Sequence, residues 1–510
     1  TFTIRSPTPM LAGYGSWSDH QYTSSASGKG YTLHEYDDDG NLYYYGRFQS
    51  STAWSNDGVA VNAGSGDLYV AKRWANGTWA WTVGWPMNGA TGPGALAVDG
   101  SGNTYVAGYR SSGGLDLPGS EYDLPSREAA YFFSLDTNGS TRWSQDAFIS
   151  GSDANWHIST LASTGNYGYT RINLNETSGD LTIAGQLSSN SLTSRTVSLG
   201  NLTMEIPSTN YNYMRPFVFR INGTGDFVWG NTVTPVSNYA RTLQGMGVHD
   251  DGSVDLLMRA YGETVFGEHT SEEESYHYVI GRLNNTGSWT GASEVVEPSS
   301  GFYGPQDTAM MQLAPSGELI LAMWSMEDIT NLTVNGTVTW FNESCQDSLV
   351  VMSLNGPDRA ISATKEFCLN SGAAAHGDYN SLLEIDGNGM PVLFLGTTQS
   401  WQAGHHKIIR FDSDLNPDYE ETVICNNDLT CTNLLDWDDV AFDPLGNMLV
   451  YHYTHQCNLY WNGSYMGRTS SNCNYQSHFF MEQVGHTIDG ETLVEGEPST
   501  LWGVMGLSAM

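Results

Sequence analysis

Apolar and polar residues alternate with a period of two along most of this chain, in short runs separated by glycine-containing turns. The stretch 95–110 shows the pattern clearly. Leu96 and Val98 alternate with small residues before an Asp-Gly-Ser-Gly-Asn turn, and Tyr105 and Ala107 alternate with their neighbours after it. Alternation over a few residues predicts a half-buried strand, and a tight turn between two such runs predicts a β-hairpin.

A second pair of expected strands follows in the same stretch of chain. An apolar run at 131–135 leads to an Asn138-Gly139 turn, and a short strand closes on Trp143. Together the two hairpins predict four antiparallel strands within about 50 residues, which is the size of one blade of a β-propeller.

The four-stranded unit occurs seven times at a spacing of roughly 57 to 77 residues, and a fixed period of this order is typical of propellers, solenoids and arrays. Paired hairpins with a tryptophan after the last turn fit a propeller blade better than a solenoid repeat, which is usually shorter and more even. Ring closure also protects sheet edges that a linear array would expose. We therefore predict an all-β fold, a seven-bladed β-propeller of four-stranded antiparallel blades with short terminal extensions.

The expected domain boundaries follow from the repeats. An N-terminal arm is expected at 1–30, with Thr1–Ile4 as a strand candidate, and a C-terminal tail at 495–510. The blades are expected at 31–90, 91–150, 151–235, 236–300, 301–370, 371–430 and 431–494. Inserted strands or hairpins are expected at VSLGNLTMEI, NLTVNGTVTW and NLYWNGSYMG.

Two repeats carry a resemblance to a known family. The segments GNTYVAGYRSS and YFFSLDTNGSTRW, and the variant VSLGNLTM with PFVFRINGTGDFVW, resemble the seven-bladed β-propeller repeats of bacterial and archaeal secreted and cell-surface proteins. The resemblance covers about 31 to 494 and implies the propeller fold and a surface location. It implies no catalytic residues, because the repeat is an architectural unit. The fourth, sixth and seventh units depart from the pattern, and the sixth lacks the closing tryptophan.

Charge narrows the range of partners. The formal net charge is -35, and only 15% of residues are charged against 39% hydrophobic and 12% aromatic residues. This composition is typical of a folded, β-rich chain. An acidic surface repels nucleic acid and anionic membranes, so neither is expected as a partner. No apolar run approaches the roughly 20 residues that span a bilayer, so no transmembrane segment is expected in the chain.

Cysteines and glycosylation sequons both favour an extracellular location. The simplest pairing of the six cysteines joins sequence neighbours into disulfides, and the alternative, a metal site, lacks the usual CxxC spacing. The expected pairs are Cys345 with Cys368, Cys425 with Cys431, and Cys457 with Cys473. Sequons for glycans are dense, although Asn-Gly-Thr is also a good turn sequence. They begin at Asn76, Asn138, Asn175, Asn201, Asn222, Asn284, Asn331, Asn335, Asn342 and Asn462.

Acidic turns, which include those at Asp37–Asn41, Asp99–Asn103 and Asp412–Asn416, are the candidates for a cation site. The best set is Asp412, Asp414, Asn416 and Asp418, because alternate oxygen ligands suit Ca²⁺, which takes about six to eight oxygens. The competing interpretation is that Asp and Asn accept hydrogen bonds from the backbone of their own turns, and this is favoured. No other cofactor is expected. The acidic group Asp436, Asp438 and Asp439 is expected to be solvated surface.

No motif predicts catalysis. The sequence lacks HExxH, GxSxG, P-loop and strand-to-helix GxGxxG patterns, and His452 and His455, three apart on an expected strand, would point to opposite faces. Aromatic residues are expected mostly to wedge between blades, whereas Trp340, Tyr460 and Trp461 on the inserts could contact a partner.

The expectation is therefore a non-enzymatic extracellular surface protein. It would be a structural or adhesive subunit, either self-assembling into a surface layer or filament or binding proteins or glycans through blade loops. The alternative is a secreted carbohydrate-active enzyme, a glycosidase or lyase, with a site at the mouth of the propeller channel. That alternative requires two carboxyl groups from different blades to converge there.

Overall fold

The structure is a computed structural model. It describes residues 32–47, 52–56, 59–63, 68–76, 78–85, 91–110, 129–149, 154–157, 171–175, 178–189, 195–200, 202–206, 213–235, 242–261, 263–271, 276–296, 308–325, 331–340, 348–356, 358–368, 382–395, 405–424, 435–444, 448–454, 458–461, 464–468, 477–483 and 503–506.

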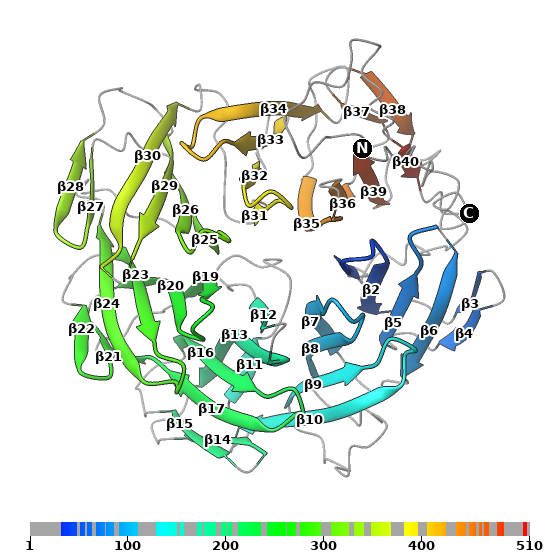
Figure 1. The fold of residues 1–510 in the computed structure, drawn as a ribbon, viewed down its shortest axis with the longest axis horizontal. Helices are drawn as coiled ribbons and strands as arrows, with labels where there is room; N and C mark the ends of the chain where they lie inside the picture. Colours follow the sequence, from blue (N-terminus) through cyan, green and yellow to red (C-terminus); the bar gives the residue numbers. More distant parts are fainter. Residues whose placement is uncertain are drawn as a thin grey trace, which may run out of the picture.

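These residues form antiparallel four-stranded sheets that radiate from a common centre in a propeller-like arrangement (Figure 1). The prediction of an all-β fold is confirmed. Among the residues described, no helical segment has the length and hydropathy that crossing a bilayer requires.

The first three sheets begin near the N-terminus. The first contains β1 (Thr32–Tyr36), β2 (Leu42–Arg47), β5 (Leu68–Arg73) and β6 (Trp79–Trp85), with the hairpin β3 (Thr52–Asn56) and β4 (Val59–Ala63) beside it. The second contains β7 (Thr91–Val98), β8 (Thr104–Arg110), β9 (Ala129–Leu135) and β10 (Thr141–Ile149). The third contains β13 (Asp180–Ser189), β16 (Tyr213–Ile221) and β17 (Phe227–Thr232), and both β11 (Ala154–His157) and β12 (Arg171–Asn175) pair with β13.

The remaining sheets repeat this order. The fourth contains β19 (Thr242–Val248), β20 (Val254–Tyr261), β23 (Tyr276–Leu283) and β24 (Trp289–Val296). The fifth contains β25 (Thr308–Leu313), β26 (Leu319–Ser325), β29 (Ser348–Asn355) and β30 (Ala360–Cys368), and a parallel bridge from β19 to β25 joins it to the fourth. The sixth contains β31 (Leu382–Ile385), β32 (Pro391–Leu395), β33 (His405–Phe411) and β34 (Pro417–Ile424). The last contains β35 (Leu435–Phe442), β36 (Met448–Thr454), β39 (Ser477–Gln483) and β40 (Gly503–Gly506).

Inserted hairpins attach to the sheet that precedes their own. The hairpin of β14 (Arg195–Leu199) and β15 (Leu202–Ile206) extends from the third sheet but pairs with β10 of the second. In the same way β27 (Asn331–Val334) with β28 (Thr337–Trp340) pairs with β24, and β37 (Asn458–Trp461) with β38 (Ser464–Arg468) pairs with β34. A shorter hairpin, β21 (Thr264–Phe266) with β22 (His269–Ser271), pairs with β18 (Thr234–Pro235). The expected inserts are therefore hairpins, and they fasten neighbouring sheets together.

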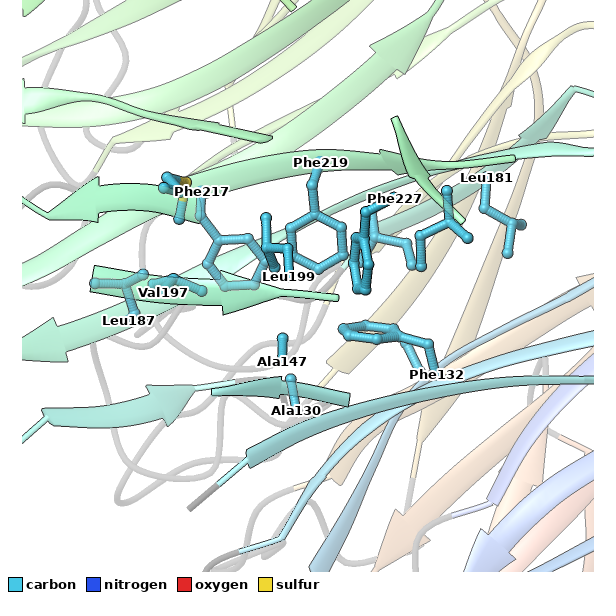
Figure 2. Close-up of a cluster of buried hydrophobic side chains, with 14 of the residues drawn as sticks. Ala130, Phe132, Ala147, Leu181, Leu187, Val197, Leu199, Phe217, Phe219 and Phe227 are labelled. Carbon is cyan, nitrogen blue, oxygen red and sulfur yellow. The ribbon is translucent and has the colours of Figure 1, made fainter. Parts of the chain in front are cut away.

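Apolar side chains fill the spaces between neighbouring sheets. Figure 2 shows the cluster between the second and third sheets, where the rings of Phe132 and Phe219 meet edge to face at 5.1 Å. Val197 and Leu199 of the inserted hairpin belong to the same cluster and are fully buried. Burial of this apolar surface is the main force that holds the sheets in place.

Tryptophans also connect successive sheets. Trp81, Trp143 and Trp229 each follow the last turn of a sheet and lie against the corresponding turn of the next sheet. The indole nitrogen of Trp81 donates to the carbonyl of Thr137 at 2.8 Å, and that of Trp229 donates to Asn285 at 3.0 Å. The expectation that tryptophans wedge between blades is confirmed for these three residues.

One expected boundary differs from the structure. Residues 503–506 were assigned to a tail outside the propeller, but they form β40 and pair with β39 to complete the last sheet. The apolar Val504 and Met505 extend the sheet because their backbone groups satisfy the free edge of β39.

Candidate functional site at the centre of the propeller

Three carboxyl groups come together on the innermost strands. Glu35 lies on β1, Glu384 on β31 and Asp439 on β35, and each is half-buried. β35 packs against both β1 and β31, so three sheets bring these side chains to one place. The other three residues of β31 are apolar, which makes a carboxyl group on that strand unusual.

Asp439 closes the joint between the first and last sheets. Its Oδ2 accepts a hydrogen bond from the backbone N–H of His34 at 2.6 Å and lies 2.9 Å from the His34 Nδ1. The imidazole of His34 is 4% exposed and packs edge to face on Tyr44. The side chain of Asp439 therefore links β35 to the backbone of β1.

Glu384 interacts with polar residues from two other sheets. The amide of Gln312, on β25, donates to its Oε2 at 3.0 Å. The positive charge of Arg171, on β12, acts on the same carboxyl group and lowers its pKa. Residues from the third, fifth and sixth sheets are thus coupled electrostatically through Glu384.

Burial shifts the pKa values of all three carboxyl groups and of His34. Desolvation, together with the nearby charges of Asp439 and Glu384, raises the pKa of Glu35 to about 8. The pKa of Glu384 is raised to about 7 by burial, with Arg171 opposing the shift. Burial raises the pKa of Asp439 well above its usual range and lowers that of His34 to about 3. At neutral pH Glu35 is thus mainly protonated, whereas Glu384 is close to half ionised.

This arrangement suits acid–base chemistry. A carboxyl group that keeps its proton at pH 7 can donate it, and a neighbouring carboxylate can accept one. Titratable groups with pKa values shifted toward neutrality are typical of functional sites. We define Glu35, Glu384 and Asp439, with Gln312 and Arg171, as the central carboxyl cluster.

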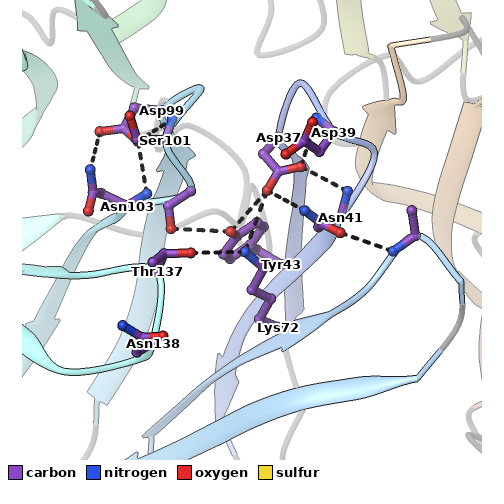
Figure 3. A network of polar contacts seen from close by, with 12 residues as sticks. Asp37, Asp39, Asn41, Tyr43, Lys72, Asp99, Ser101, Asn103, Thr137 and Asn138 are labelled. Atoms are coloured by element: carbon purple, nitrogen blue, oxygen red, sulfur yellow. Dashed lines mark hydrogen bonds and ion pairs between the residues drawn. The ribbon is translucent and has the colours of Figure 1, made fainter.

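The acidic turns that the sequence singled out have a different arrangement. Figure 3 shows Asp37, whose Oδ1 accepts the backbone N–H groups of Asp39 and Asn41 at 3.1 and 2.8 Å. Its Oδ2 accepts from the Tyr43 hydroxyl at 3.1 Å and lies 3.6 Å from the Lys72 ammonium. These oxygens hold the turn, as the favoured interpretation expected.

The turn at Asp99 repeats the arrangement of the Asp37 turn. The Asp99 Oδ1 accepts the backbone N–H groups of Ser101 and Asn103 at 3.0 and 2.8 Å, and its Oδ2 accepts from the Tyr105 hydroxyl at 3.0 Å. The Tyr43 hydroxyl of the first sheet also lies 3.1 Å from the carbonyl of Gly102, so the two turns meet across the sheet boundary.

The turn at Asp412, the candidate calcium site, has the same hydrogen-bond arrangement as the turns at Asp37 and Asp99. Oδ1 of Asp412 accepts the backbone N–H groups of Asp414 and Asn416 at 2.9 and 2.7 Å, and the Asn416 amide also donates to this carboxylate. These hydrogen bonds lower the pKa of Asp412. An amide that donates to the carboxylate is not directing its oxygen at a shared ion. The side chain of Asp418 lies outside the described residues, and calcium at this turn stays a prediction.

Some of the predicted cysteine and glycosylation sites lie on turns that the structure describes, and others lie outside the described residues. The side chains of the six cysteines lie outside the described residues, as do Asn201, Asn342 and Asn462. Asn76, Asn138 and Asn335 are exposed on turns. Asn222 and Asn284 accept hydrogen bonds from their own turns, in the position that Asp136 occupies in the second sheet. Glycosylation at any of these sites stays a prediction.

The sequence did not single out Glu35 or Glu384, and it misplaced Asp439. Asp439 was expected on the solvated surface, but its side chain is 17% exposed and bonded to His34. The signal that could have found the cluster is the turn at the end of each innermost strand. Glu35 and Glu384 both stand two residues before the aspartate that begins this turn, where the second, fourth and last sheets have the small residues Ala97, Gly247 and Ala441.

Comparison with known proteins adds little. No protein-family profile matches the chain, and no curated protein matches it. Among solved structures, the NanB sialidase from Streptococcus pneumoniae, in complex with 2-[(3-chlorobenzyl)ammonio]ethanesulfonate, has 10% identity and a TM-score of 0.37, covering 91% of this chain and 69% of its own. The exotype rhamnogalacturonan lyase YesX has 12% identity and a TM-score of 0.30, covering 83% and 89%. A likeness at this level carries no argument about activity.

Proposed function

We propose that the protein is an extracellular acid–base enzyme acting on glycans, with its site at the centre of a seven-bladed propeller. The observation that supports this proposal is the meeting of Glu35, Glu384 and Asp439 from three different sheets. Contacts between innermost strands run in the order β1, β7, β12, β19, β25, β31, β35 and back to β1, which supports seven blades.

The two glutamates have the properties that cleavage of a glycosidic bond needs. Glu35, with a pKa of about 8, keeps its proton at pH 7 and would protonate the leaving oxygen. Glu384, with a pKa of about 7, is the better base or nucleophile. Gln312 and Arg171 would orient it and stabilise its charge.

Charge favours a neutral or amino-sugar glycan as the substrate. The net charge of -35 would repel an anionic polymer on approach. A neutral sugar meets no such barrier, and a protonated amine would be attracted to the acidic protein.

The test is turnover by the purified protein on a panel of neutral, amino-sugar and uronate polysaccharides. We expect cleavage of one of the first two classes, with kcat/KM falling below about pH 7 and above about pH 8. Glu35→Gln and Glu384→Gln should each lower kcat by about 10²- to 10⁴-fold. Glu268→Gln, on the exposed turn between β21 and β22, is the matched control. Activity that survives both glutamine variants would overturn the proposal.

A second candidate function is binding through the outer hairpins. β28 exposes Trp340 and Val338, at 70% and 46%, on the side of the hairpin away from buried Leu332 and Val334. An exposed tryptophan is a common anchor for a partner. Loss of binding to a glycan or protein array in Trp340→Ala, with no turnover detected, would favour this adhesive role.

A further inference from the structure

The joint between β1 and β35 contains charged and polar side chains. Apolar clusters join the first sheet to the second, and each following pair through to the fifth and sixth. At the joint of the first and last sheets, the backbone N–H of His34 donates to the Asp439 Oδ2, and the His34 Nδ1 lies 2.9 Å from the same oxygen. Polar groups thus contribute to ring closure at this joint.

Charged groups gather at the same joint. His34 and Glu35 lie on β1, Asp439 on β35 and Glu384 on β31, while Arg171 acts on Glu384 from β12. β7, which also packs on β1, has no charged residue, and β2 contributes the ring of Tyr44. β25 contributes the neutral Gln312. The side chains of Asp436 and Asp438 on β35, and of His452 on β36, lie outside the described residues.

We propose that this joint is a pH-dependent closure of the ring, which is tight while the clustered carboxyl groups keep their protons and loosens when they ionise together. Three half-buried carboxylates on adjoining strands repel one another, and Arg171 offers one compensating charge. The repulsion acts directly on the contact between β1 and β35, because Asp439 and Glu35 lie on those two strands.

The direction of the pH dependence follows from the protonation of the clustered carboxyl groups. The raised pKa of Glu35, about 8, and of Glu384, about 7, means that these groups bind more protons in the folded than in the unfolded chain near neutral pH. The free energy of closure therefore decreases as the pH rises toward and through these values. His34 acts in the opposite direction only in acid, since its pKa is lowered to about 3.

The experiment is hydrogen exchange of the full chain between pH 5.5 and 9, with rates corrected for intrinsic exchange. We expect protection of β1 and β35 to fall at least tenfold above pH 8, while β9 and β16, which carry fully buried apolar residues, stay protected as internal references. Glu35→Gln should remove most of the pH dependence, and Glu384→Gln should remove part of it. Glu268→Gln, on the exposed turn between β21 and β22, should leave it unchanged.

Two outcomes would overturn the inference. One is protection of β1 and β35 that does not change with pH in the wild-type chain. The other is an alkaline loss of protection that persists unchanged in Glu35→Gln and in Asp439→Asn. The readout is exchange, so the inference stands or falls independently of turnover.

Discussion

At the scale of the residue, two glycines with positive φ differ in whether a tryptophan ring packs against them. Gly225 has a φ of +94°, and a Cβ at this position would lie 2.7 Å from the ring of Trp143. Gly317 has a similar φ of +84° but open space around it. Substitution of the two glycines by alanine therefore distinguishes the cost of backbone strain from the cost of disturbed packing between sheets.

We expect Gly317→Ala to lower the free energy of unfolding by about 1 kcal/mol, from backbone strain alone. Gly225→Ala should lower it by about 2 to 4 kcal/mol, because strain and overpacking against Trp143 add. Urea denaturation of both variants measures the difference. Equal losses would mean that Trp143 moves aside at little cost.

At the scale of the element, the inserted hairpins are not equivalent. β15 buries Met204 and Ile206 against the core between the second and third sheets, whereas no residue of β28 is buried. The first hairpin therefore supports the fold, and the second presents a surface.

Ile206→Ala should lower the free energy of unfolding by about 2 to 5 kcal/mol, since its side chain is 1% exposed and its loss leaves a cavity. Val338→Ala on β28 should change it by less than about 0.5 kcal/mol. Thermal denaturation of the two variants checks both values. A large loss in Val338→Ala would show that the exposed face is covered in solution.

At the scale of the whole molecule, stability should depend on pH in a direction set by the centre. Glu35, Glu384 and Asp439 have raised pKa values, so their contribution is lost as pH rises from about 4.5 toward 8. His34, with its pKa lowered to about 3, makes a contribution that is lost as pH falls below about 6.5. We expect maximum stability in weakly acid solution.

Urea midpoints measured from pH 4 to pH 9 test this expectation. The decline between pH 6 and pH 8 should be smaller in Glu35→Gln than in the wild type, because the variant has one fewer proton to release. A midpoint that rises steadily to pH 8 in the wild type would contradict the assigned protonation.

The centre of the propeller could be only partly predicted. The turns at Asp37 and Asp386 were recognisable, and they mark the ends of two innermost strands. That Glu35 and Glu384 meet could not be recognised, because the two are far apart in the chain and only closure of the ring brings their sheets together. Asp439 was misjudged because its neighbours in sequence, Asp436 and Asp438, indicated an exposed acidic loop.

The sequence by itself determined the local structure, since alternation of apolar residues and glycine-containing turns specify hairpins over a few residues. It also determined where tryptophans such as Trp143 follow a turn. Tertiary structure alone decided that the hairpin at 195–206 joins the preceding sheet, that 503–506 completes the last one, and that carboxyl groups meet at the centre. Strand pairing at long range depends on burial and free edges in the assembled molecule, which no local pattern records.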